Sequence, residues 1–131
     1  MSDKILVKDF MRKEVISCSP EDDIVKAANI MKDNKIGVLV VIKEKSLVGI
    51  ISERDIINKV VSKNLDYKNT KVKNIMTRKV VVGTPDLTDV EAAIIFAKEK
   101  IKKLPILKNK KVVGIITQTD LLKVISFKWA L

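Results

Sequence analysis

Two seven-residue stretches of the sequence carry a hydroxyl side chain three residues before an aspartate. They are Gly49-Ile50-Ile51-Ser52-Glu53-Arg54-Asp55 and Gly114-Ile115-Ile116-Thr117-Gln118-Thr119-Asp120. Each hydroxyl residue follows an apolar, strand-like run and is a natural helix N-cap. A helix N-terminus presents free N–H groups and partial positive charge, which favour an anionic ligand. An Asp in the first turn can also accept hydrogen bonds from both hydroxyls of a ribose, which makes a nucleotide site one hypothesis.

The same spacing has a purely structural explanation. A Ser or Thr N-cap with a carboxylate three residues later forms a capping box, and for one copy alone this explanation is favoured. A capping box usually closes with Glu or Gln, whereas both copies here carry Asp. Lys102 and Lys103 precede an apolar strand and suit a phosphate group, although a solvated Lys patch explains them equally well. Both explanations stay open at this point.

The two stretches belong to a tandem duplication. A shift of 65 positions aligns residues 7–60 with residues 72–125 without a gap, and 19 of the 54 pairs are identical. Such self-similarity identifies an internal repeat. We therefore divide the chain into a repeat over 7–60, a polar linker over 61–71 and a second repeat over 72–125.

Both repeats predict the order β-α-β-β-α. The first strand is expected at 15–17 and 80–82, after short leading segments at 7–11 and 72–76. Hairpins are expected from strands at 38–42 and 47–51, and at 104–107 and 112–116, before a second helix that starts at Ser52 or Thr117. The first helix shows apolar residues at three- and four-residue spacing: Ile24, Ala27, Ala28 and Met31, matched by Val90, Ala93, Ile94 and Ala97.

The fold class is therefore α/β (α+β). With 54 aligned positions, each repeat is marginal for independent folding. We expect the two repeats to pack with pseudo-twofold symmetry and to share one core.

Composition narrows the class of protein. The chain has 131 residues, 47% apolar and 32% charged, which is typical of a folded globular protein. No apolar run approaches the about 20 residues of a membrane span, and no signal peptide is visible, so we predict a cytoplasmic protein without a membrane partner. The absence of His excludes Ser–His–Asp catalysis and His-ligated metal sites. The one cysteine, Cys18, is expected to be a small buried hydrophobe. We predict that the protein is not an enzyme.

The net charge of +10 raises a nucleic-acid hypothesis. However, 23 of the 26 cations are Lys, and the Arg residues are only Arg12, Arg54 and Arg78. Base-edge recognition favours Arg, and five aromatic residues offer little surface for stacking bases. A nucleic-acid-binding protein that uses its Lys-rich surface therefore stays as the alternative function, with weak binding expected.

The duplicated pattern resembles a tandem pair of CBS domains, the Bateman module. The resemblance rests on Val-Lys-Asn-Ile-Met-Thr at 72–77, Ile-Lys-Lys-Leu-Pro-Ile at 101–106, and Gly-hydrophobic-hydrophobic-Ser/Thr-x-x-Asp in both repeats. Such pairs typically bind AMP, ADP, ATP or S-adenosylmethionine in clefts between the repeats. The resemblance implies a non-catalytic adenine-nucleotide sensor without a catalytic cofactor. A regulated enzyme partner, as yet unidentified, is compatible with that role.

The resemblance also implies which residues line two clefts. One takes Ser52 and Asp55 with Ile101, Lys102 and Lys103, and the other takes Thr117 and Asp120 with Ile36, Gly37 and Val38. In the family the Asp holds the ribose hydroxyls, and cations at the Lys102 and Lys103 positions and beside the Asp, here Arg54, meet phosphates. Two leading segments line base and ribose, and they contribute Lys8, Lys13, Lys73, Arg78 and Val80.

The second cleft departs from the family pattern. Gly37 and Val38 stand where the other repeat has Lys102 and Lys103, and Val40 replaces Pro105. The Asp120 cleft is therefore expected to be weak, empty or selective for an uncharged ligand. The Asp55 cleft is expected to be the stronger one for phosphorylated ligands.

Apolar residues end this charged chain, at Phe127, Trp129 and Leu131. A fraying tail is normally polar, so these residues either cover the core of the monomer or form an interface. Because CBS pairs commonly form flat dimers through their helices, we predict a homodimer.

Overall fold

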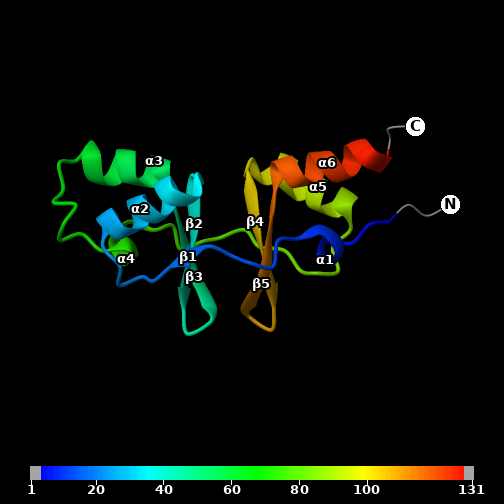
Figure 1. Ribbon diagram of the computed structural model, residues 1–131, viewed down its shortest axis with the longest axis horizontal. Coiled ribbons are helices and arrows are strands. Elements are labelled where there is room, and N and C mark those ends of the chain that lie inside the picture. The colour runs from blue at the N-terminus through cyan, green and yellow to red at the C-terminus, as the bar shows by residue number, and fades with distance from the viewer. Residues whose placement is uncertain (1–3, 129–131) are drawn as a thin grey trace. The chain divides into compact units, whose positions relative to one another are not determined.

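The computed structural model describes residues 4–128, which form two compact units (Figure 1). The Asp55 unit consists of residues 16–80. The Asp120 unit combines residues 4–15 with residues 81–128. Each unit therefore holds the body of one repeat and the leading segment of the other. The predicted α+β class is confirmed, whereas the pseudo-twofold packing stays a prediction.

In the Asp55 unit the strands are β1 (Ser17–Cys18), β2 (Val38–Lys43) and β3 (Ser46–Ser52), and the helices are α2 (Ile24–Asn34), α3 (Glu53–Ile56), the π-helix η1 (Ile57–Val61) and α4 (Val72–Ile75). The Asp120 unit has α1 (Val7–Phe10), α5 (Asp89–Glu99), β4 (Lys103–Lys108), β5 (Lys111–Thr117) and α6 (Gln118–Lys128). β2 pairs antiparallel with β3, and β4 with β5. None of the helices within residues 4–128 has the length and apolar character needed to cross a bilayer.

Both predicted hairpins are present, with tighter turns than the sequence indicated. Glu44 and Lys45 have φ values of 51° and 69°, and Asn109 and Lys110 have 54° and 68°. Positive φ at both central residues is typical of the two-residue type I′ turn, whose twist matches that of the strands. The strands therefore extend closer to each turn than predicted.

The expected first strand differs between the repeats. In the first repeat it is reduced to Ser17–Cys18, parallel to β2. The prediction of a strand at 80–82 was wrong, because only Gly83 bridges β4 there. The Gly83 amide donates to the Pro105 carbonyl at 2.9 Å, but a second bridge would need an N–H on residue 105, which proline lacks.

Acidic and hydroxyl caps start the two long helices α2 and α5. The Asp23 carboxylate accepts from the Lys26 amide at 2.8 Å and caps α2. In α5 the cap is Thr88, and Glu91 closes a complete capping box. Both helices end at a lysine in the left-handed conformation, at Lys35 and Lys100.

The apolar stripe of α5 was predicted one residue out of register. Val90 and Ile94 are 56% and 58% exposed, whereas Asp89, Ala92 and Phe96 are buried. The stripe of α2 is buried at Ile24, Ala27 and Met31 as predicted, but Ala28 is exposed. The error in register arose because the first buried position of α5 is Asp89. A search for apolar residues at helical spacing passes over a buried carboxylate.

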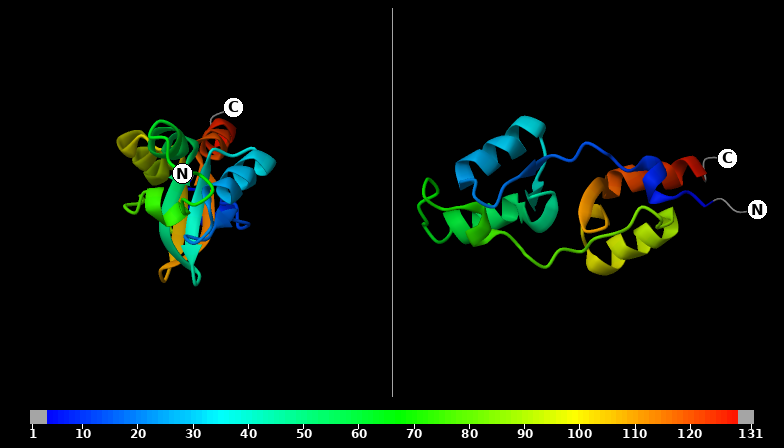
Figure 2. Two further views of the ribbon diagram at one scale, coloured as in Figure 1. Left: turned by 90° about the vertical axis from the view of Figure 1, so that its left-hand side faces the viewer. Right: turned by 90° about the horizontal axis from the view of Figure 1, so that it is seen from below.

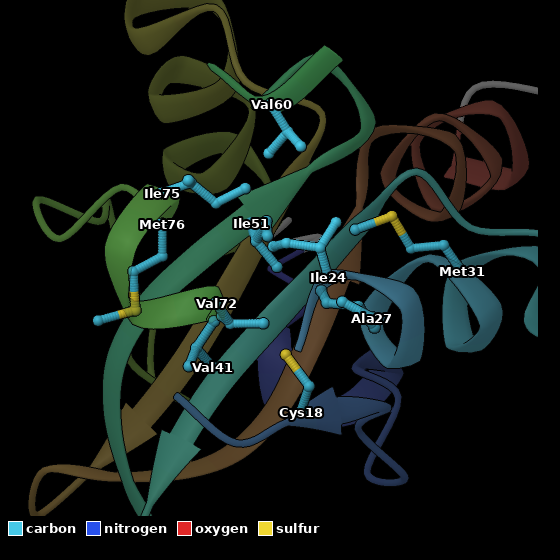
Figure 3. Packing of buried hydrophobic residues seen from close by; sticks show 11 residues of the cluster. Cys18, Ile24, Ala27, Met31, Val41, Ile51, Val60, Val72, Ile75 and Met76 are labelled. Atoms are coloured by element: carbon cyan, nitrogen blue, oxygen red, sulfur yellow. The ribbon is translucent and has the colours of Figure 1, made fainter. Parts of the chain in front are cut away.

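Each unit has its own apolar core, so the prediction of one core shared by the two repeats was wrong. In the Asp55 unit, α2 and α4 cover β2 and β3, as the sticks of Figure 3 show. Its buried residues include Ile24, Met31, Leu39, Val41, Ile51, Val60, Val72 and Ile75. Cys18 lies in this core, and burial, followed by the charge of Asp22, raises the pKa of its thiol to about 11. The thiol therefore stays protonated at neutral pH, in agreement with its predicted role as a small hydrophobe.

The Asp120 unit buries an ion pair where the Asp55 unit buries an aliphatic side chain. Asp89, only 1% exposed, aligns with Ile24 of the first repeat. Its Oδ2 accepts from Lys128 Nζ at 2.9 Å, and its Oδ1 accepts from the Val90 amide. The contact joins the first turn of α5 to the end of α6, which lie side by side (Figure 2).

Removal of one partner of this pair should destabilise the protein. We expect Lys128→Met to lower the free energy of unfolding in urea by about 3 kcal/mol, because it leaves a buried carboxylate without its cation. Asp89→Ile combined with Lys128→Met restores the apolar pattern of the first repeat and should recover most of that loss. If the double variant is as unstable as Lys128→Met alone, the pair is not the cause.

Candidate functional site

Gly49, in the middle of β3, allows the segment after α4 to lie against the strand. A Cβ at residue 49 would lie 2.7 Å from Met76 Sδ and 3.0 Å from the Thr77 carbonyl oxygen. Thr77 exchanges two backbone hydrogen bonds with Ile50, of 2.8 and 2.9 Å. Glycine is therefore needed at this position because another backbone segment approaches the strand closely.

The Asp120 unit repeats this arrangement with residues of β5 and the N-terminal segment. A Cβ at Gly114 would lie 2.6 Å from Met11 Sδ and 3.1 Å from the Arg12 carbonyl oxygen. Arg12 exchanges backbone hydrogen bonds of 2.9 and 3.0 Å with Ile115. Residues 12 and 77 thus occupy equivalent places, each beside the strand that leads to a candidate Asp.

Asp55 closes a complete capping box at the start of α3. Its Oδ2 accepts from the Ser52 amide at 2.9 Å, and the Ser52 hydroxyl accepts from the Asp55 amide at 3.1 Å. Its Oδ1 also pairs with Lys59 Nζ at 3.1 Å, one helical turn on. The structural explanation of the motif therefore holds in this copy, and the carboxylate is held in place with 14% of its side chain exposed.

Lys59 links this capping box to the leading segment. Besides its contact with Asp55, its Nζ donates to the Ile75 carbonyl at 3.0 Å, at the end of α4. Lys59 belongs to the π-helix η1, a rare conformation that often marks functional sites. The Asp55 carboxylate, β3 and α4 are thus held together within one unit.

Asp120 has a different charged partner. Its amide donates to the Thr117 hydroxyl at 3.0 Å, as in the first copy. Its two carboxylate oxygens accept from one guanidinium, at 2.8 Å from Arg12 Nε and 3.0 Å from Arg12 Nη2. This bidentate pair lowers the pKa of Asp120, with a smaller contribution from Thr117 and an opposing effect of partial burial.

The remaining predicted residues lie partly beside these carboxylates within each unit. Val38 pairs with Ser52 across the β2–β3 ladder, and the Gly37 carbonyl accepts from the Glu53 amide at 2.9 Å. In the Asp120 unit, Lys103 pairs with Thr117, and the Lys102 carbonyl accepts from the Gln118 amide at 2.8 Å. The partly buried Ile36 and Ile101 precede these strands, and Arg54 is exposed beside Asp55. The assignment of these residues to shared clefts stays a prediction.

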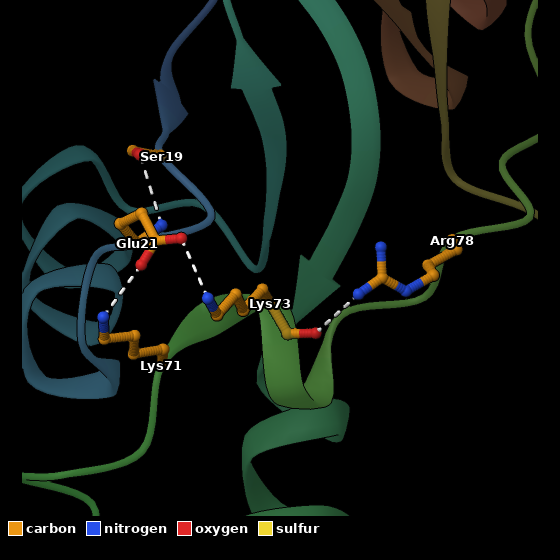
Figure 4. A network of polar contacts seen from close by, with 5 residues as sticks. All are labelled: Ser19, Glu21, Lys71, Lys73 and Arg78. Atoms are coloured by element: carbon orange, nitrogen blue, oxygen red, sulfur yellow. Dashed lines mark hydrogen bonds and ion pairs between the residues drawn. The ribbon is translucent and has the colours of Figure 1, made fainter.

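Two predicted cations of the Asp55 unit belong to a polar network (Figure 4). Glu21 accepts from Lys71 Nζ at 2.8 Å and from Lys73 Nζ at 2.9 Å. Both hydrogen bonds lower the pKa of Glu21, to about 2, and the one from Lys71 has the larger effect. Arg78 donates to the Lys73 carbonyl at 3.2 Å. Lys73 therefore fastens α4 to the segment before α2, in addition to any contact with a ligand.

The other leading segment has a looser version of this contact. Lys8 Nζ lies 4.0 Å from Asp86, the residue that aligns with Glu21. Lys13 is exposed, and Val80 is half-buried in the segment that follows Arg78. These three residues stay predicted site residues.

Sequence analysis missed two residues that contact the candidate carboxylates, Arg12 and Lys59. Lys59 lies four residues after Asp55, a spacing that places both on one helix face and was available as a signal. Arg12 gave no such signal, because the partnership with Asp120 spans 108 positions. The repeat alignment offered a single hint about Arg12, because the aligned residue of the second repeat is Thr77.

This geometry suits a ligand with vicinal hydroxyls and an anionic group. A carboxylate offers about four lone-pair positions, so Asp55 retains acceptor capacity beyond its contacts with Ser52 and Lys59. Each Asp lies where a strand ends and a helix begins, next to backbone N–H groups. The arrangement can bind and orient such a ligand.

Comparison with known proteins gives matches over nearly the whole chain. The CBS domain family model matches residues 7–62 and 72–127. Protein MJ1426 of Methanocaldococcus jannaschii is 33% identical, with 91% of this chain and 90% of that protein covered. Inosine-5'-monophosphate dehydrogenase of the same organism is 36% identical, but the match covers 93% of this chain and only 23% of the enzyme.

Solved structures give the same result. The crystal structure of the CBS domain pair of protein MJ0100, in complex with 5′-methylthioadenosine and S-adenosyl-L-methionine, has a TM-score of 0.83 and 31% identity. The match covers 95% of this chain and 98% of that chain.

The Arg12 contact makes a prediction about pH. Because the folded-state pKa of Asp120 lies below its ordinary value of about 3.9, the pair stabilises the fold above that value and is lost as the pH falls through the lowered pKa. We expect Arg12→Thr to raise the pKa of Asp120 in a carboxyl-carbon NMR titration and to leave that of Glu21 unchanged. Equal Asp120 midpoints in both proteins would contradict the pairing.

Proposed function

The chain belongs to the CBS-domain family, and from this premise we propose that it is a non-catalytic sensor that binds an adenosine-type ligand. The ribose hydroxyls bind the carboxylate of Asp55, and the adenine lies against apolar backbone. Binding changes the shape of the protein or its contact with a partner. AMP, ADP and ATP are the ligands we propose first, with S-adenosylmethionine as a further one.

One observation supports the proposal above the others. Asp55 is fixed by Ser52 and Lys59 and is only 14% exposed on its side chain, yet its carboxylate retains acceptor positions for two hydroxyls. A capping box needs no such spare capacity. Preorganisation of this kind lowers the entropic cost of binding a diol.

The ligand class is supported by the MJ0100 domain pair, whose two ligands share an adenosine moiety and differ in the group attached at sulfur. Common recognition of the nucleoside, with variable recognition of the attached group, fits the ribose-binding role of Asp55. For the phosphates of AMP or ATP, the sequence suggests Lys102, Lys103 and Arg54. Their contact with a ligand on Asp55 is part of this proposal.

A regulated enzyme is the partner we propose. Support comes from inosine-5'-monophosphate dehydrogenase, in which a region like this chain accompanies a much longer enzyme. The nucleic-acid alternative predicts affinity that falls steeply with salt, since each neutralised phosphate releases counterions.

The ligand site is tested by exchange of one carboxylate at a time. We expect Asp55→Asn to weaken AMP binding about ten- to a hundredfold in calorimetry, because hydrogen bonds to a charged group contribute about 1.5–3 kcal/mol each. Asp120→Asn, the matched control in the other repeat, should change AMP affinity little. Lys102→Ala with Lys103→Ala should weaken ATP more than adenosine.

Two results would contradict the proposal. One is unchanged AMP affinity in Asp55→Asn together with loss of binding in Asp120→Asn, which would reverse the assignment of the sites. The other is tight DNA binding at about 0.15 M salt that is insensitive to nucleotide, which would favour the nucleic-acid function.

We further propose a homodimer formed through exposed apolar helix faces. Leu122 and Phe127 of α6 are 58% and 83% exposed, and Ile94 of α5 is 58% exposed. Trp129 and Leu131, which also led to this prediction, lie outside the described residues. Apolar side chains exposed on two adjacent helices favour an interface.

The dimer is tested by one charged substitution on this face. Light scattering at tens of micromolar should give twice the chain mass of 14.7 kDa for the natural sequence and about that mass for Leu122→Glu. Lys123→Glu, on the adjacent exposed position of the same helix, should leave the dimer intact. A natural chain that is monomeric at this concentration rules out the dimer.

A further inference from the structure

Residues 12 and 77 provide an internal comparison between the two candidate sites. Both follow a methionine that packs on a strand glycine, and both exchange two backbone hydrogen bonds with the residue after that glycine. The backbone is therefore placed in the same way in both units. The side chains differ: an arginine at 12 and a threonine at 77.

The arginine makes the two carboxylates unequal before any ligand arrives. Arg12 binds both oxygens of Asp120 through Nε and Nη2, at 2.8 and 3.0 Å. A guanidinium in this bidentate arrangement donates two parallel hydrogen bonds to one edge of the carboxylate. The two hydroxyls of a ribose would donate to the same pair of oxygens.

Asp55 faces no such competitor among the contacts described. Its Oδ1 pairs with the single ammonium of Lys59, which is a compact charge that acts on one oxygen only. Its Oδ2 accepts from the Ser52 amide, a contact that fixes the carboxylate within the helix start. Neither donor presents the fork that Arg12 presents to Asp120.

We infer that Arg12 is a specificity-determining residue that acts as an internal competitor at Asp120 and closes this carboxylate to neutral ribosides such as adenosine. This inference rests on the proposed function, because it assumes that a ribose binds the Asp. The Arg12 side chain is 63% exposed and can swing away from the carboxylate. A phosphorylated ligand compensates for the lost pair, since a guanidinium binds phosphate as well as carboxylate.

The consequence is a difference in ligand selection between the two repeats. Asp55 accepts adenosine with or without phosphate. Asp120 discriminates against adenosine, because adenosine has no phosphate to pair with the displaced Arg12. Of the three sequence-based expectations for the Asp120 site, namely weak, empty or selective for an uncharged ligand, this excludes the third.

The test measures each site separately by calorimetry with adenosine and with AMP. In an Asp55→Asn chain, which leaves Asp120 to be measured, we expect Arg12→Thr to increase adenosine affinity about five- to tenfold, since the competitor keeps only a fraction of the sites open. The gain for AMP should be smaller. Threonine is the residue that the other repeat carries here, and residue 12 is exposed, so the fold should be retained.

Two further variants serve as controls. Arg12→Lys keeps the positive charge but loses the two parallel N–H donors of the guanidinium. It should increase adenosine affinity less than Arg12→Thr. In an Asp120→Asn chain, Thr77→Arg places a guanidinium beside the Asp55 carboxylate. It should weaken the binding of adenosine at Asp55 more than the binding of AMP.

The outcomes separate this inference from the proposed function. If Asp55 binds adenosine in the Asp120→Asn chain but Arg12→Thr changes neither ligand at Asp120, the inference is wrong and the proposed function stands. Equal gains for adenosine and AMP also overturn it, because the guanidinium then does not distinguish them. If neither the natural chain nor any variant binds adenosine or AMP, both the inference and the proposed function are overturned.

Discussion

Contact between a leading segment and a strand glycine brings that segment alongside the strand that leads to each candidate carboxylate. Met76 and Thr77 lie on Gly49, and Met11 and Arg12 lie on Gly114, at distances that leave no room for a Cβ. The strand continues past the glycine into the helix start that carries the Asp. Without this contact, residues 12 and 77 would not lie beside the strands that lead to the carboxylates, and the two units would lose the segments that complete their cores.

The duplication allowed one carboxylate motif to be used in two ways. In the Asp55 unit the Asp closes a capping box and pairs with Lys59 from its own helix. In the Asp120 unit the corresponding pairing comes from Arg12, on a segment that is distant in sequence. Divergence at positions 12 and 59 thus gives two carboxylates that each follow a hydroxyl N-cap but have different electrostatic neighbours. The repeats also differ in their cores, because Ile24 is buried in one unit and the Asp89–Lys128 pair takes the aligned position in the other.

Much of this was predictable because the repeat provided two independent copies of each element. The hairpins and the starts of the second helix in each repeat followed from local pattern and turn chemistry. The prediction failed where a distant residue decided the outcome. The apolar stripe of α5 was misplaced because its buried series begins with Asp89, which pairs with Lys128, 39 positions away. The strand at 80–82 is absent because Pro105, on another strand, has no N–H to donate. The role of Arg12 was missed for the same reason.

In the function we propose, the ribose of an adenosine-type ligand binds the Asp55 carboxylate in preference to that of Asp120. The most direct measurement is a titration of the uniformly ¹⁵N-labelled protein with adenosine, followed by backbone amide NMR. We expect the amide signals of Ser52 and Asp55 to shift first, at adenosine concentrations that leave the signals of Thr117 and Asp120 unchanged. Shifts that begin at Asp120, or that miss both carboxylates while the ligand binds, would contradict it.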